Sequence, residues 1–222
     1  MTKAPRAAEI QAAYESGDLA LIAKTHIQDA AFGSHNSKDL LSCGLGTKLA
    51  QMAATAPEEL LHKTFKSLVR AFLGQRTNPA VRQATQTPLA DTLILFSNSA
   101  QAYPSLQAEV CQQLCGIAAT SQSIKRSKLL HGHLLSVILN LAPHYPSKAI
   151  QLAQAYAQSM DFSGHETQGE ILAQRTQELG KALETPRSKE AICIRKCEFY
   201  DTLIYVGKSL GLQCGFQPKP LK

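Results

Sequence analysis

Apolar residues recur every three to four positions along most of this chain, which is the spacing of amphipathic helices. The pattern is strongest from Ile124 to Ala142, where two apolar rows run side by side: Leu130, Leu134, Val137 and Leu141, and next to them His131, Leu135, Ile138 and Ala142. An apolar face this wide is buried by neighbours on two sides. Pro143 ends the pattern, because proline cannot continue a helix. The stretch predicts a central helix of an all-helical domain, with His131 in the core and His133 on the surface.

A second amphipathic helix is expected between Pro57 and Gly74. The run Pro57-Glu58-Glu59 places a proline and two acids where a helix start favours them. The apolar face of this helix holds Leu61, Phe65, Leu68 and Phe72, and the opposite face holds a cationic row of Lys63, Lys66 and Arg70. Like charges one turn apart repel by a few tenths of a kcal/mol per pair. The row is therefore a small local cost that an acidic partner would relieve.

Proline, glycine and polar turn residues divide the rest of the chain into further helices. Besides the two above, the expected helical segments are 5–14, 19–30, 38–54, a short one from 78, 89–102, 105–119, 146–160, 166–183 and 186–210. Helices joined by such short links tend to pack antiparallel. We expect an all-α fold of about ten helices packed as antiparallel helical hairpins, in a short solenoid-like stack or an irregular bundle. The chain is expected to form a single domain, 1–222, with a soft boundary near 143–147 and a flexible tail at 216–222.

Positive charge is concentrated in the middle of the chain. The formal net charge is +6, and between Leu60 and Met160 nine basic residues face only two acids, Asp91 and Glu109. A zone of this kind attracts an acidic partner, and less so at high salt. The candidate partner-binding residues are Lys63, Lys66, Arg70, Arg76, Arg82, Lys125, Arg126 and Lys128.

Three functions are consistent with this charge distribution. The first is a non-enzymatic protein–protein interaction or adaptor module whose basic face binds an acidic segment of another protein. The second is a nucleic-acid-binding protein that places the same residues on phosphates, although the absence of tryptophan and the 6% aromatic content argue against stacking platforms for single strands. The third is an enzyme with a helical fold, which would need a pocket joining His131 or His133 to an acid or a cysteine.

Motifs that carry catalysis or metal binding are weak in this sequence, so we expect no catalytic residue, metal or cofactor. Gly207-Lys-Ser209-Leu-Gly211 matches a nucleophile elbow, but no acid or histidine follows Ser209, as the hydrolase order requires. Two Cys-x3-Cys pairs, Cys111/Cys115 and Cys193/Cys197, each place two thiols on one helix face. Four thiolates from two facing helices could hold a soft metal ion, but buried thiols that act as small core hydrophobes are the commoner outcome.

The location of the protein is also constrained by its apolar runs. The longest, Leu134 to Ala142, is about half the length that spans a bilayer and contains Ser136 and Asn140. No apolar segment follows the basic first residues, as it would in a secretory signal. Together with cysteines expected to be reduced, this predicts a cytoplasmic protein without a membrane span. Export by a route that reads no such signal, as for a secreted effector, is left open.

Overall fold

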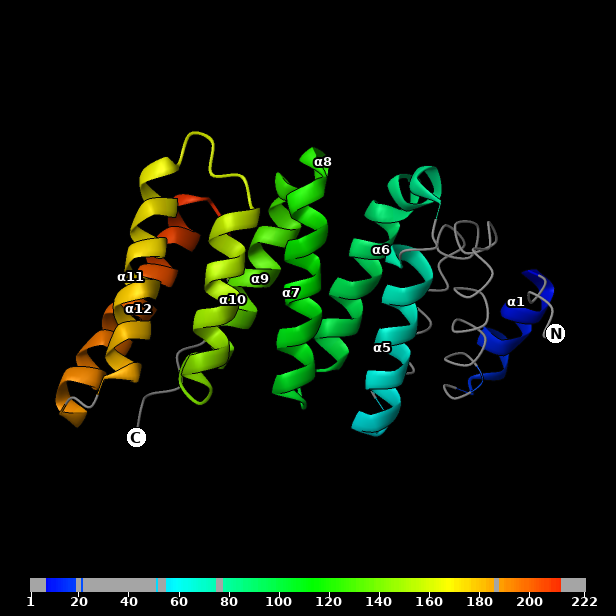
Figure 1. The fold of residues 1–222 in the computed structure, drawn as a ribbon, viewed down its shortest axis with the longest axis horizontal. Coiled ribbons are helices and arrows are strands. Elements are labelled where there is room, and N and C mark those ends of the chain that lie inside the picture. The colour runs from blue at the N-terminus through cyan, green and yellow to red at the C-terminus, as the bar shows by residue number, and fades with distance from the viewer. Residues whose placement is uncertain are drawn as a thin grey trace. The chain divides into compact units, whose positions relative to one another are not determined.

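The structure, a computed structural model, describes residues 7–18, 21, 51, 55–74, 78–185 and 188–212. All the secondary structure in these residues is helical (Figure 1). Within these ranges there are nine helices and no strand. The all-α prediction is confirmed. Most of the two segments expected at 19–30 and 38–54, and all of the tail at 216–222, lie outside the described residues.

The helices divide into two compact units. Their bounds are α1 Ala7–Ser16, α5 Glu58–Leu73, α6 Pro79–Ser99, α7 Pro104–Thr120, α8 Gln122–Lys125, α9 Lys128–Leu141, α10 Pro146–Ser159, α11 Glu166–Glu184 and α12 Lys189–Ser209. The N-terminal unit is Met1–Val110 and the C-terminal unit is Cys111–Lys222, so the division falls inside α7. A single domain with a soft boundary at 143–147 stays a prediction.

In the N-terminal unit, α5 and α6 pack against each other through the apolar face expected for α5. Leu61, Phe65, Leu68 and Phe72 of α5 are all buried, as are Leu89, Leu93 and Phe96 of α6. The Phe65 and Phe96 rings stack with their centroids 6.3 Å apart. This contact fixes the rotation of α5 about its own axis, and the cationic row is left facing outward.

Helix α6 corrects the prediction of two separate segments on either side of Thr87-Pro88. It is one helix of 21 residues with Pro88 inside it, and the Asn78 side chain caps its start by accepting from Ala80 N at 2.9 Å. Proline in a helix interior removes one backbone hydrogen bond and crowds the preceding turn. Burial of Thr85 and Leu89 on either side of Pro88 holds the helix together across that defect. Tertiary packing therefore overrides the local stop signal.

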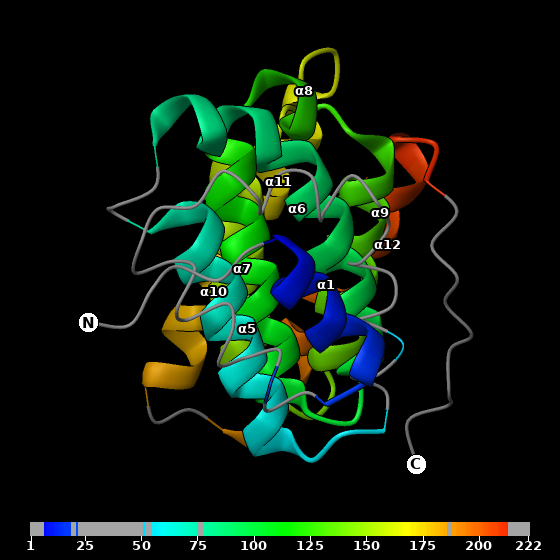
Figure 2. The same ribbon diagram turned by 90° about the vertical axis from the view of Figure 1, so that its right-hand side faces the viewer.

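In the C-terminal unit, four helices follow one another as antiparallel hairpins, α9 with α10 and α11 with α12 (Figure 1). Helix α10 also packs on α11. Helix α12 packs on α9, near which it is seen in Figure 2. The core of this unit includes Leu134, Ile138, Tyr156, Leu172 and Leu203. The predicted antiparallel packing of neighbouring helices is confirmed here.

The central helix begins later than the apolar pattern indicates. The short helix α8 ends at Lys125, Arg126 lies in a turn, and α9 starts at Lys128. Ser127 caps α9, its hydroxyl accepting a hydrogen bond from Leu130 N at 3.3 Å. A serine that satisfies a free N–H at a helix start stabilises a new helix at that residue. The prediction of one helix from 124 was therefore wrong by one turn.

Candidate functional site

The cationic row of α5 (Lys63, Lys66 and Arg70) is exposed along its length. Lys63 makes an ion pair with Glu59 one turn earlier, with Nζ 2.8 Å from Oε1, and this partner lowers the pKa of Glu59. No ion pair joins Lys66 or Arg70 to an acid among the residues that the structure describes. The two are one helical turn apart, so their positive charges reinforce each other toward solvent.

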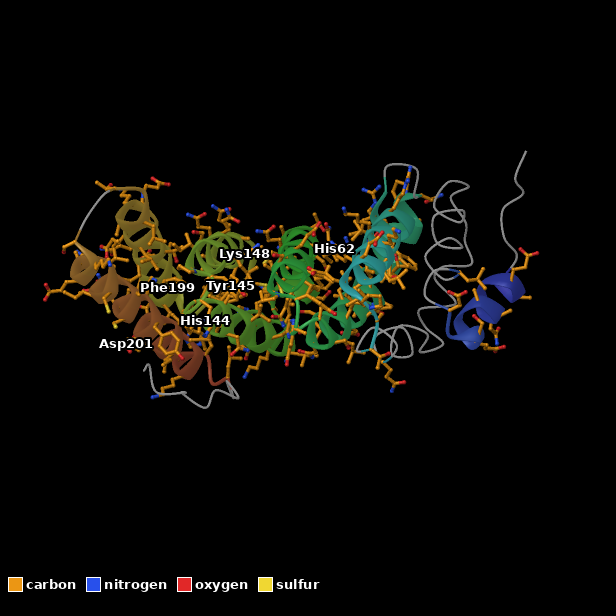
Figure 3. The ribbon with its side chains drawn as sticks, turned by 90° about the horizontal axis from the view of Figure 1, so that it is seen from below. His62, His144, Tyr145, Lys148, Phe199 and Asp201 are labelled. Atoms are coloured by element: carbon orange, nitrogen blue, oxygen red, sulfur yellow. The ribbon has the colours of Figure 1, made fainter. Side chains whose placement is uncertain are left out.

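The other acids near α5 are directed to His62, which is labelled on this helix in Figure 3. Its Nε2 lies 3.7 Å from Oε1 of Glu58, and its Nδ1 lies 3.5 Å from Oε2 of Glu109. Asp91 on α6 has its pKa raised by burial rather than lowered by a basic neighbour. Asp91 and Glu109, the two acids of the central basic zone, thus leave Lys66 and Arg70 uncompensated in the described part of this unit.

Arg82 lies apart from this row. Its side chain is half-buried, and Nη2 donates to the Gly74 carbonyl at 3.0 Å. Its Nε is buried without a hydrogen-bond partner in the described structure. Arg82 therefore ties the start of α6 to the end of α5. Arg76, the other candidate in this region, lies outside the described residues.

A second cationic group lies in the C-terminal unit, at the junction of α8 and α9. Arg126 is bound to Asp161, with Nε 2.6 Å from Oδ2, and Asp161 N–H donates to the Lys125 carbonyl at 3.0 Å. Hydrogen bonds from Ser163 and from Arg126 hold the pKa of Asp161 well below its usual range. Lys125 is half-buried and Lys128 is exposed. Arg126 is therefore compensated by an acid that sequence reasoning did not select.

His131 occupies the core position that the sequence predicts. It is 5% exposed, and its Nδ1 lies 2.9 Å from the Tyr156 hydroxyl. The rings of His131, Tyr156 and Phe162 meet edge to face. Burial lowers the pKa of His131 against opposing hydrogen bonds from the backbone. These contacts are those of a packed structural histidine.

His133 corrects the surface position expected from the helix pattern. It is half-buried, and its Nε2 lies 3.7 Å from Sγ of Cys111 on α7. Burial lowers its pKa to about 4, so the imidazole is neutral at pH 7. Cys111 is fully buried, and burial raises the pKa of Cys115, one turn further along α7, to about 11. The thiolate that nucleophilic chemistry needs is therefore disfavoured at Cys115.

The two cysteine pairs differ in their surroundings. Cys111 and Cys115 are buried as expected, but Cys193 and Cys197 are exposed on α12, because α12 buries Phe199, Leu203 and Val206 instead. No group of three or more histidine, cysteine or acidic residues that could hold a metal ion is found in the described ranges. The four thiols therefore do not converge on one metal site.

The elbow motif at Ser209 is likewise explained by helix structure. Ser209 is the last residue of α12, and Leu203–Val206, which would be the strand of an elbow, are helical. Gly211 follows with φ +64°, a conformation that glycine adopts at helix ends. The motif has the geometry of a helix terminus.

None of the described helices has the length and hydropathy to span a bilayer. Comparison with protein-family models, with curated proteins and with solved structures found no match to this chain.

Proposed function

We propose that this protein is a non-enzymatic interaction module that binds an acidic segment of another protein through α5. Lys66 and Arg70 make the central contacts, and Lys63 lies at the edge. The observation that carries the proposal is that Lys66 and Arg70 are exposed and unpaired with any described acid, while the opposite face of the same helix is anchored in the core. The cations are thus presented on a rigid element.

The repulsion between Lys66 and Arg70 favours the binding of an acidic segment. Two cations one turn apart repel by a few tenths of a kcal/mol, and a pair of carboxylates placed over them removes that cost. Each exposed ion pair contributes about 0.2–1 kcal/mol. The contact therefore contributes more to the rate and selectivity of association than to raw affinity, which suits a reversible adaptor.

An acidic protein segment fits these residues better than a nucleic acid does. Binding to duplex nucleic acid by charge involves on the order of 6–10 phosphate contacts, and α5 offers three cations. The aromatic residues of α5, Phe65 and Phe72, are buried, so bases find no ring there on which to stack. Glu58 and Glu59 at the start of the same helix repel any anion placed over them, so a phosphate backbone that runs along the whole helix is disfavoured, whereas a short acidic peptide can end before them.

Lys125 and Lys128 are assigned a secondary role in the C-terminal unit. Arg126, between them, is held by Asp161, which lowers the positive charge available for a partner. We place the interaction in the cytoplasm, where the cysteines of the chain would be reduced.

The test is binding of a fluorescein-labelled oligoglutamate peptide, measured by anisotropy across a salt series, beside a duplex and a single-stranded oligonucleotide. The variant Lys66→Glu/Arg70→Glu should weaken peptide binding at least about fivefold, because two ion pairs worth about 0.5 kcal/mol each are lost. The matched control, Lys189→Glu/Lys208→Glu, changes the net charge equally at two exposed positions of α12.

The control variant should bind the peptide as the parent does. Equal weakening in both variants would mean that only net charge matters and would refute the α5 site. Tighter binding of the oligonucleotides than of the peptide, with a steep loss at high salt, would refute the acidic-protein proposal in favour of nucleic-acid binding.

A further inference from the structure

Two thiols lie on the solvent side of α12, and the proposed function does not use them. Cys193 and Cys197 are both exposed and lie one helical turn apart. They are on the side of α12 away from the buried Phe199 and Val206. Burial, together with the neighbouring Cys193, raises the pKa of Cys197. Two thiols one turn apart are thus presented to solvent on the same helix.

Charges of both signs surround this pair on α12: Lys189 and Lys196 lie within one turn of Cys193, as does Glu190, and Asp201 lies one turn after Cys197. Arg195, between the two cysteines in sequence, is bound to two acids, with its Nη1 2.7 Å from Oε2 of Glu198 and 3.5 Å from Oε2 of Glu178. Asp201, one turn after Cys197, interacts electrostatically with that thiol. The guanidinium charge is therefore neutralised by its own partners, and the two lysines and two acids that remain balance each other, so the sulfurs themselves decide which ion binds.

Helix geometry distinguishes a bridging ion from a direct disulfide. Side chains at i and i+4 of an α-helix have Cβ atoms about 5–6 Å apart, whereas a disulfide requires about 3.5–4.5 Å. Closing an S–S bond would therefore distort α12. An ion between the sulfurs separates them by up to about twice a metal–sulfur distance of about 2.3 Å, or about 4.6 Å, which this spacing accommodates with the helix intact.

The site offers two thiolate ligands, and this number decides which metal ion it can bind. Structural zinc takes four ligands in a tetrahedron, and no third histidine, cysteine or acid completes a metal site here among the described residues. Soft thiolate ligands select Cu(I) among the remaining ions. We propose that Cys193 and Cys197 form a two-coordinate dithiolate site for Cu(I).

The binding step is balanced without a redox partner. One Cu(I) ion bonds to both sulfurs, and the two thiol protons pass to solvent. No electron is transferred, and the site changes from neutral to a net charge of −1. Because two protons are released per ion, affinity should rise as pH rises.

The experiment is anaerobic competition for Cu(I) against a chromophoric chelator, with ascorbate present, in a Cys43→Ser/Cys214→Ser background. Only the four described cysteines remain in this protein. The parent should take up one equivalent, and Cys193→Ser/Cys197→Ser should lose it. Each single serine variant should weaken binding at least tenfold, because the chelate is broken.

The chain supplies its own matched control in Cys111 and Cys115, which have the same spacing but are buried on α7. Cys111→Ala/Cys115→Ala should retain the full equivalent, with circular dichroism confirming that it remains helical. If that control unfolds, Cys115→Ala alone serves the same purpose. Uptake that persists in the Cys193→Ser/Cys197→Ser protein, or that the control abolishes while folded, would overturn the proposal.

Discussion

The half-buried imidazole of His133 makes the stability of this protein dependent on pH. Its pKa is lowered by burial from the ordinary value of 6.5 to about 4, a difference of about 2.5 units. At 1.36 kcal/mol per unit, protonation of this ring destabilises the fold by up to about 3 kcal/mol. Proteins usually have free energies of unfolding of about 5–15 kcal/mol, so the protonation of one histidine would remove a large part of the total stability.

The direction of this pH dependence is set by whether the folded or the unfolded chain takes up the proton at the higher pH. The unfolded chain takes up a proton at His133 near pH 6.5, and the folded chain does so only near pH 4. The contribution to stability is therefore fully present above pH 6.5, is lost as the pH falls toward about 4, and changes no further below that. Burial lowers the pKa of His131 as well, so that ring acts in the same direction.

The assay is urea unfolding of parent and His133→Gln, followed by far-ultraviolet circular dichroism between about pH 7 and pH 4. The variant loses the contact with Cys111 and should be less stable at pH 7. Its free energy of unfolding should then fall less on acidification, by about 1–3 kcal/mol over this range. Carboxylates titrate in both proteins and cancel in the difference. His144→Gln, at an exposed position after α9 (Figure 3), is the histidine control.

Parallel pH profiles of the parent and His133→Gln would refute the reasoning. So would an imidazole proton resonance of His133 that titrates near 6.5 in the folded protein. Either result would mean that water reaches the ring as freely in the folded state as in the unfolded chain.

Three further predictions follow from particular contacts. Pro88→Ala should raise the free energy of unfolding by about 1–3 kcal/mol, because alanine restores the hydrogen bond missing within α6; an unchanged or lower denaturation midpoint would contradict this. Tyr156→Phe should cost about 1–3 kcal/mol, since buried His131 loses its hydroxyl partner, while Tyr205→Phe, at an exposed tyrosine, should cost less than about 0.5 kcal/mol. Replacing the whole cationic row of α5 by glutamate should leave the helical circular-dichroism signal intact, and its loss would mean that the row is structural.

Much of the fold was predictable because helix periodicity is a local property. The rows Leu61/Phe65 and Leu130/Leu134 identify the buried faces from spacing alone, and both are buried. The same spacing places Lys66 and Arg70 away from the core, where the structure leaves them exposed. His131 could be assigned to the core for the same reason.

The contacts that decide the chemistry of single residues could not be predicted in this way. Asp161 pairs with Arg126 across 35 residues of sequence, and His133 meets Cys111 across 22. Both contacts depend on how one helix is placed against another, and neither helix specifies that placement within its own sequence. Sequence reasoning therefore left Arg126 open to a partner and placed His133 in solvent.

Helix α12 shows most clearly what helix spacing alone cannot predict. Apolar residues lie around much of α12, so its spacing allowed a face containing Cys193 and Cys197 to be buried. Packing against α11 and α9 selected the face of Phe199, Leu203 and Val206 instead. The sequence by itself determined the all-helical elements and the polarity of their clearest faces. Only the tertiary structure decided which of two apolar faces was buried and which acids met which cations, because burial free energy depends on the surface that a neighbouring helix offers.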